Sequence, residues 1–141
     1  MQKSHRKLTA TVAVSLALLV TTSLAGCSAW AGSRQGYLVF DDKGEAVSEG
    51  GKDVPAWLPD DATGITLDYP ATGSGYLMKF ASAAGVPVSA SCAVGPENEP
   101  LKPTISADWW PKQPLTTDRR VCGATQVARL GNEWYAWANG S

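Results

Sequence analysis

Three cysteines supply the thiols of this 141-residue chain, and their surroundings predict two kinds of chemistry. Cys27 stands alone, directly after an apolar run and the small residues Ala25 and Gly26. Cys92 and Cys122 lie about 30 residues apart in the second half of the chain, with no CxxC motif. A thiol can be acylated, oxidised or bound to a metal, and its environment decides which of these occurs.

The segment before Cys27 has the three parts of a secretory signal peptide. A basic stretch, MQKSHRK, precedes the apolar run VAVSLALLV at residues 12–20, and the small residues of TTSLAG follow. We therefore expect residues 1–26 to be a signal peptide that is removed on export. A membrane-spanning helix is the alternative, but Thr and Ser interrupt the apolar run and no basic flank follows it.

The segment LAGC at residues 24–27 resembles the lipobox of bacterial lipoproteins. This resemblance implies that Cys27 receives a diacylglyceryl group and that cleavage separates Gly26 from Cys27, after which the new amino terminus is open to acylation. Two or three acyl chains hold a protein on a membrane far longer than one chain does. We expect a lipid-anchored protein on the extracytoplasmic face of the cell membrane, with residues 27–35 as a tether.

Cys92 and Cys122 are expected to form a disulfide, because the leader directs the chain to an oxidising compartment. A metal pair and a redox pair are the alternatives. Neither is supported, since the one histidine, His5, lies in the leader and no second cysteine cluster exists. The sequence therefore predicts a structural disulfide and no metal site.

The charge balance differs between the leader and the rest of the chain. The leader holds three of the 12 Lys and Arg residues and none of the 13 acidic ones, so residues 27–141 are acidic. An acidic domain is a poor partner for nucleic acid, which needs clustered positive charge. All six tryptophans lie after the leader, which favours a folded domain over disorder.

Patterns in the first half of this domain predict strands. GYLVF at residues 36–40 favours a strand, followed by a turn at DDKG. GITLDY at 64–69 alternates apolar and polar residues, as a half-buried strand does. YLMKFAS at 76–82 places Tyr76, Met78 and Phe80 on one side of a second strand, and TGSG lies between the two. These two segments predict a β-hairpin.

Further strand patterns follow in the second half. We expect a strand at 85–94, an exposed proline-rich loop at 95–103 and a short extended segment at 104–111. The stretches 120–130 and 133–139 flank Gly131–Asn132, which predicts a tight hairpin. Residues 36–141 are thus expected to form one mainly β domain, a small antiparallel sheet or sandwich with one disulfide; a compact α+β fold is the alternative.

The domain also resembles a family of small secreted lipoproteins of Gram-positive, actinobacterial type. The resemblance is carried by VPAWLPDDATGITLDYPATGSGYLMKF at 54–80, ADWWP at 107–111 and WYAW at 134–137. No activity is assigned to that family, so the resemblance implies no catalytic residue.

Catalysis has little support in the residue types present. His5 leaves with the leader, so a Ser–His or Cys–His pair has no base. An acid-based hydrolase needs two carboxylates around a cleft, and the acids near aromatic residues are Asp60, Asp61, Asp108 and Glu133. Turn formation explains Asp60 and Asp61 without catalysis. We expect no catalytic residue and no cofactor.

Five aromatic residues in two short segments are the candidate ligand-binding set: Trp109, Trp110, Trp134, Tyr135 and Trp137. In a strand, neighbouring residues of the last three face opposite sides, so aromatic rings lie on both. These rings either fill the core, which we favour, or bind a sugar or a protein. The sequence predicts a non-catalytic binding module of the cell envelope that recognises a glycan or an exported protein. The alternative is a structural or accessory protein that acts only through protein contacts, which fully buried indoles with no groove would favour.

Overall fold

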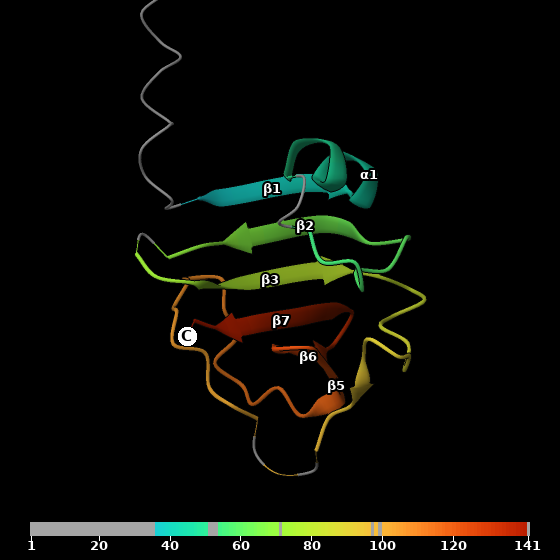
Figure 1. Cartoon of the computed structure of the whole chain (residues 1–141), viewed down its shortest axis with the longest axis vertical. Coiled ribbons are helices and arrows are strands. Elements are labelled where there is room, and N and C mark those ends of the chain that lie inside the picture. The colour runs from blue at the N-terminus through green and yellow to red at the C-terminus, as the bar shows by residue number, and fades with distance from the viewer. Residues whose placement is uncertain (1–35, 51–53, 71, 97, 99, 141) are drawn as a thin grey trace, which may run out of the picture. The chain divides into compact units, whose positions relative to one another are not determined.

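Seven strands form one antiparallel sheet in the part of the chain that the computed structural model describes, residues 36–50, 54–70, 72–96, 98 and 100–140 (Figure 1). They are β1 (Tyr37–Asp42), β2 (Thr63–Asp68), β3 (Gly75–Ala81), β4 (Ala93–Val94), β5 (Thr117–Cys122), β6 (Thr125–Leu130) and β7 (Glu133–Asn139). The predicted mainly β fold is confirmed. The signal peptide, Cys27 and the tether lie outside the described residues.

The last strand lies in the middle of the sheet. The strand order is β1-β2-β3-β7-β6-β5-β4, so the chain crosses from β3 to the far edge and returns through β5, β6 and β7. β3 and β7 pair in unbroken register from Gly75 opposite Asn139 to Ala81 opposite Glu133 (Figure 1). Both predicted hairpins, β2–β3 and β6–β7, are present.

The alternation of side chains along β3 and β7 divides the core between the two faces of the sheet. On one face, Met78, Phe80 and Trp134 pack in a cluster that also takes side chains from segments 54–62 and 82–92. On the other face, Tyr135 and Trp137 pack in a second cluster, which the segment from 105 to 115 completes. Irregular segments, not a second sheet, therefore cover both faces.

Two of the expectations for the first half are corrected. The turn expected at residues 41–44 is absent, because β1 continues to Asp42, whose Oδ1 accepts a 2.9 Å hydrogen bond from the Glu45 main-chain N–H. This N-cap starts the short helix α1 (Lys43–Glu45), which continues as the π-helix η1 (Ala46–Gly50). Strand β2 is also not half-buried, since Thr66 on its other face is as well covered as Leu67.

The expected strand at 85–94 is mostly wrong, because only Ala93 and Val94 pair with the sheet. Gly85 has a positive φ of 68° and Pro87 lacks a donor, so the chain leaves the strand conformation here. The extended segment expected at 104–111 is likewise replaced by a turn, in which the Trp110 N–H donates to Ala107 O at 3.0 Å. The described residues of the expected loop at 95–103 belong to no strand.

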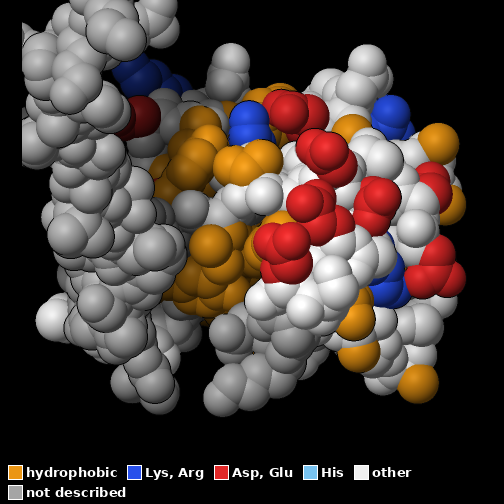
Figure 2. All heavy atoms as spheres, turned by 90° about the horizontal axis from the view of Figure 1, so that it is seen from above, with side chains coloured by type: hydrophobic (Ala, Val, Ile, Leu, Met, Phe, Trp, Pro, Cys, Tyr) orange, Lys and Arg blue, Asp and Glu red, His pale blue; other side chains and the backbone are white. Residues whose placement is uncertain are grey.

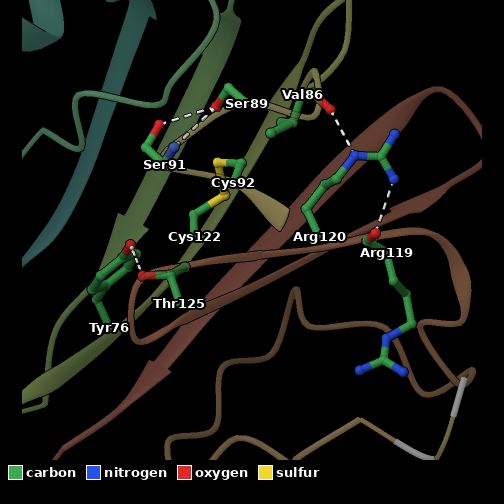
Figure 3. The surroundings of a disulfide bond; sticks show 9 residues. All are labelled: Tyr76, Val86, Ser89, Ser91, Cys92, Arg119, Arg120, Cys122 and Thr125. Carbon is green, nitrogen blue, oxygen red and sulfur yellow. Dashed lines mark hydrogen bonds between the residues drawn. A yellow bond between two sulfur atoms is a disulfide. The ribbon is translucent and has the colours of Figure 1, made fainter. Parts of the chain in front are cut away.

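The predicted disulfide joins Cys92 to Cys122, with Cα atoms 4.1 Å apart (Figure 3). It ties the irregular segment after β3 to the end of β5. A turn with Gly123 at φ 63° directly follows, so the stretch 120–130 contains two strands instead of one. No helix in the described part of the chain is both long and apolar enough to span a membrane.

Candidate functional site

The strongest candidate site is a cavity of about 510 Å³ on the face that carries Trp134. We call it the arginine cleft. It is lined by the segment 81–87, by the β5 and β6 side chains Asp118, Arg120 and Arg129, by Asn132 in the turn before β7 and by Trp134 in β7. Its size lies within the range typical of small-molecule and peptide sites.

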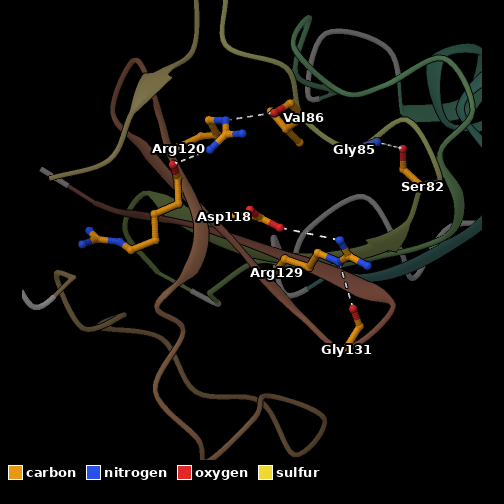
Figure 4. A network of polar contacts seen from close by, with 8 residues as sticks. Ser82, Gly85, Val86, Asp118, Arg120, Arg129 and Gly131 are labelled. Carbon is orange, nitrogen blue, oxygen red and sulfur yellow. Dashed lines mark hydrogen bonds and ion pairs between the residues drawn. The ribbon is translucent and has the colours of Figure 1, made fainter. Parts of the chain in front are cut away.

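The segment 82–85 forms one wall of the cleft and is fixed by Asp61, from the loop before β2. Asp61 accepts hydrogen bonds from the Ser82 hydroxyl at 2.5 Å and from the Ala83 and Ala84 main-chain N–H groups, each at 2.9 Å. These bonds, the Ser82 one foremost, lower the pKa of Asp61 from its ordinary value. The Ser82 hydroxyl in turn accepts from the Gly85 N–H at 2.9 Å (Figure 4).

Gly85 closes this wall against the indole of Trp134. A Cβ at this position would lie 2.6 Å from the Trp134 Cζ2 atom, so only glycine fits without a shift of the ring or the chain. The close packing leaves Trp134 only 5% exposed. The indole therefore supports the cleft as its floor, and its ring face is not available for stacking on a ligand.

A β-bulge in β5 sets the positions of the charged groups. Between Thr117, opposite Arg129, and Arg120, opposite Val127, two residues of β5 face one residue of β6. The first of the two, Asp118, has a φ of 49°, a left-handed conformation that is uncommon for residues other than glycine. Bulges re-aim side chains beside binding sites, and this one places Asp118 and Arg120 in the same cavity.

The two arginines of the cleft are held by main-chain carbonyl groups. Arg120 donates from Nε to Val86 O at 3.0 Å and from Nη1 to Arg119 O at 2.9 Å. Arg129 donates from Nε to Gly131 O at 2.9 Å, and its Nη1 lies 3.6 Å from Asp118 Oδ2 (Figure 4). In that view the Asp118 carboxylate lies between the two arginine side chains.

The neighbouring Arg119 has a different role. It extends from β5 in the opposite direction to Arg120 (Figure 3), and its Nη1 donates to Pro96 O and to Asn98 O, the latter at 2.5 Å. It is only 9% exposed. Arg119 thus holds the loop after β4 in place, and the adjacent pair Arg119–Arg120 is not one basic patch.

The five aromatic residues proposed from the sequence are divided between the two faces. Trp134 is the floor of the arginine cleft, whereas the other four form one cluster on the opposite face. There the Trp110 ring lies 5.7 Å from the Trp109 ring and meets the Tyr135 and Trp137 rings edge-on, at 5.6 and 5.7 Å between centroids. Tyr135 and Trp137 are buried, and Trp109 and Trp110 are partly buried. These rings pack against one another, as expected for core residues.

A small polar group borders this aromatic cluster. The Tyr135 hydroxyl donates to Glu133 Oε2 at 2.6 Å, and Lys79 Nζ lies 3.8 Å from Glu133 Oε1 and 5.7 Å from the centre of the Trp109 ring. Burial, the hydrogen bond to Glu133 and the negative charge of Glu133 raise the pKa of Tyr135 to about 12. Neither Glu133 nor Tyr135 lines the arginine cleft.

The carboxylates considered for a hydrolase have separate partners. Asp60 and Asp61 both line a second cavity of about 510 Å³ beside Trp57, but Asp60 pairs with Lys43 at 2.7 Å and Asp61 holds the 82–85 segment. Glu133 bonds to Tyr135, as described above, and Asp108 is exposed. Among the described residues no cluster of three His, Cys, Asp or Glu side chains could hold a metal.

Asp118, Arg120 and Arg129 were not among the site residues predicted from the sequence, and neither was Trp57, which lines the second cavity. The spacing of Arg120 and Arg129 carries no recognised motif, and their meeting depends on the β5 bulge and the β5–β6 pairing. A signal was present nonetheless: Gly123, inside the stretch expected to be one strand, marks the turn that places Arg120 and Arg129 on the face that holds Val127.

Charge is unevenly distributed over the domain. Residues 36–70 hold eight of the 13 acidic residues against two lysines, and acidic side chains gather over the face that carries β1 and α1 (Figure 2). Residues 71–141 hold six Lys and Arg against five acids. The arginine cleft lies in this second part, so an anionic ligand is attracted to it and repelled from the acidic face.

The chain matches no family model, and no curated protein or solved structure is significantly similar to it.

Proposed function

We propose that this protein is a lipid-anchored binding module of the cell envelope, whose ligand binds in the arginine cleft. One observation carries the proposal: two arginines, Arg120 bonded to two main-chain carbonyl groups and Arg129 to one, line an open cavity of ligand size. Donors that are already oriented lose little entropy on binding, which favours affinity. The proposal needs no catalytic group, and the one carboxylate in the cleft pairs with Arg129.

The location outside the cytoplasm is supported by two features. The LAGC segment at Cys27 and the apolar run before it fit a lipoprotein signal. The Cys92–Cys122 disulfide fits an oxidising compartment. Held by acyl chains on Cys27, the domain would encounter ligands at the outer surface of the cell membrane or in the adjacent cell wall.

A titration of the lipidated protein in detergent with soluble fragments of the cell envelope tests this function. We expect a saturable change in tryptophan fluorescence, because Trp134 lies directly under the cleft. The variant Arg129→Gln should weaken the response, whereas Lys112→Gln, which removes an exposed charge outside the cleft, should not. A flat titration with the wild-type protein would argue against a binding module.

A second candidate is an accessory protein that acts through the edge of the sheet. β1 is an edge strand, and its residues Tyr37 and Val39 are 58% and 55% exposed. Exposed edge strands accept strands from partner chains unless they are blocked. The same titration separates the two candidates: Tyr37→Glu should abolish the response if β1 is the contact, and leave it unchanged if the arginine cleft is.

A further inference from the structure

The guanidinium groups of the arginine cleft are bonded to protein oxygens and still have hydrogen-bond donors available. In each arginine, Nε and Nη1 are engaged by protein oxygens, whereas Nη2 has no partner among the described residues. Arg120 comes from β5 and Arg129 from β6, and both residues line the same cavity. Guanidinium donors of this kind bind the oxygens of carboxylates and phosphates.

The charge of the cleft selects between these anions. Two arginines and Asp118 are the charged residues among its lining, which gives a net charge of one positive unit. A carboxylate carries one negative charge and neutralises this site. A phosphate monoester carries about 1.5–2 negative charges at neutral pH, so the occupied site would be negative and Asp118 would repel the ligand more strongly. The balance therefore favours a carboxylate.

The rest of the lining favours a peptide over a sugar as the carrier of that carboxylate. Sugar sites present an aromatic ring for stacking, but the indole of this cleft is covered by Gly85. The wall instead presents the small apolar side chains of Ala81, Ala83, Ala84 and Pro87. A wall of this kind suits a small aliphatic side chain next to the charged group.

We propose that the arginine cleft binds the terminal α-carboxylate of a peptide that ends in a small aliphatic residue. This inference rests on the proposed binding function and specifies its ligand. Nη2 groups of Arg120 and Arg129 donate to the carboxylate oxygens, and the alanine-rich wall accommodates the terminal side chain. Asp118 holds Arg129 by its charge and limits affinity by repelling the incoming carboxylate.

The test is calorimetric titration of the full-length lipidated protein in detergent with N-acetyl-alanyl-alanine. Its C-terminal amide is the matched control, because it has the same shape and no charge. We expect the free acid to bind, the amide to bind at least about tenfold more weakly, and the affinity for the acid to fall with added salt. Peptides of L-alanine and D-alanine separate two sources of this group, protein termini and wall peptides, and binding of either supports the proposal.

Variants assign the binding to the cleft. Arg120→Gln and Arg129→Gln should each weaken binding of the acid by about 10–100-fold, as expected for the loss of a charged hydrogen bond. Asp118→Asn should increase the affinity for the acid several-fold, because it removes the repelling charge. Misfolding does not increase affinity, and asparagine tolerates the left-handed conformation of residue 118. Lys112→Gln, with the same loss of charge outside the cleft, should bind as the wild type does.

Failure of both peptides to bind would overturn the inference, and so would three more specific outcomes. The first is equal binding of acid and amide, and the second is unchanged binding in both arginine variants. The third is binding of glucuronic acid by a protein that binds neither peptide, which would assign the cleft to an acidic sugar. If envelope fragments still give a saturable response while both peptides fail, the binding function stands and only the ligand class is wrong; if neither gives a response, both fail.

Discussion

Single residues decide how closely the wall of the arginine cleft approaches its floor. Gly85 combines a left-handed conformation with direct contact to the Trp134 indole, so two separate requirements exclude a side chain there. Asp118 also has a left-handed conformation, but as an aspartate, a residue that tolerates it better than most. Few residue types therefore fit at two positions of the cleft: Gly85 is restricted by packing, and Asp118 supplies a charge.

Replacing Gly85 with alanine tests the packing requirement. Gly123, at φ 63°, is the matched control for Gly85 at φ 68°, because a Cβ added at Gly123 would meet no atom within 4 Å. Gly123→Ala should lower the free energy of unfolding by about 1–2 kcal/mol through backbone strain alone. Gly85→Ala should cost about 1–3 kcal/mol more, because the added carbon overlaps Trp134. Equal costs in urea unfolding would mean that the ring moves aside.

Tyr135 gives the domain a pH dependence at the alkaline end. Its pKa is raised from 10.0 to about 12, first by burial and then by the hydrogen bond to Glu133 and its charge. A raised pKa means that the folded state holds its proton more tightly than the unfolded state, so this stabilisation is complete below pH 10 and is lost as the pH rises towards 12.

The absorbance of tyrosinate, recorded against pH, measures this effect. Glu133→Gln should lower the pKa of Tyr135, because it removes the negative charge, but leave it above 10.0, because burial remains. Tyr135→Phe identifies which transition belongs to this residue, since burial also raises the pKa of Tyr76. A wild-type transition for Tyr135 near the ordinary value would show that the hydroxyl is open to solvent.

At the scale of elements, the parts of the fold that follow local patterns were predictable and the parts made by distant contacts were not. The alternating residues of β2, β3, β6 and β7 and the Gly131–Asn132 turn specify hairpins by themselves. The conformation of the segment between β3 and β5 is fixed by contacts with Asp61 and Arg119 and by the disulfide, all of which join residues far apart in the sequence. The candidate site could not be predicted for the same reason: Arg120 and Arg129 line one cavity only because β5 carries a bulge and pairs with β6.

The disulfide is the element that most clearly stabilises this irregular segment. It closes a loop of 30 residues, which corresponds to about 3–4 kcal/mol in the chain-entropy account. Cys92→Ala combined with Cys122→Ala should therefore lower the midpoint of thermal unfolding by several degrees or more. The reduced wild-type protein should unfold at the same lowered temperature; an unchanged midpoint after reduction would show that the bond does not stabilise the fold.

At the scale of the whole molecule, the proposal joins a membrane anchor to a binding domain. In this proposal Cys27 and the tether would bring the domain to the membrane, and the acidic face over β1 and α1 contrasts with the arginine cleft (Figure 2). Negatively charged lipid headgroups repel that acidic face, which favours an orientation that keeps it away from an anionic membrane. In this arrangement the lipid, not the protein surface, supplies the membrane affinity.

Replacing Cys27 tests the proposed lipid anchor. Cys27→Ala should shift the protein out of the membrane fraction on cell fractionation, because the remaining chain has no acyl group to bury. Ser28→Ala, next to it, is the control and should stay with the membrane. Retention of Cys27→Ala in the membrane fraction, equal to that of the control, would show that another part of the chain holds the protein there.

Amide NMR mapping of the lipidated protein in detergent, during titration with envelope fragments, would locate the ligand on the domain. The account predicts that the largest shifts fall on Gly85, Asp118, Arg120 and Arg129, which surround the arginine cleft, and that they saturate together. Shifts confined to Tyr37, Val39 and their neighbours on β1, or the absence of any saturable shift, would contradict it.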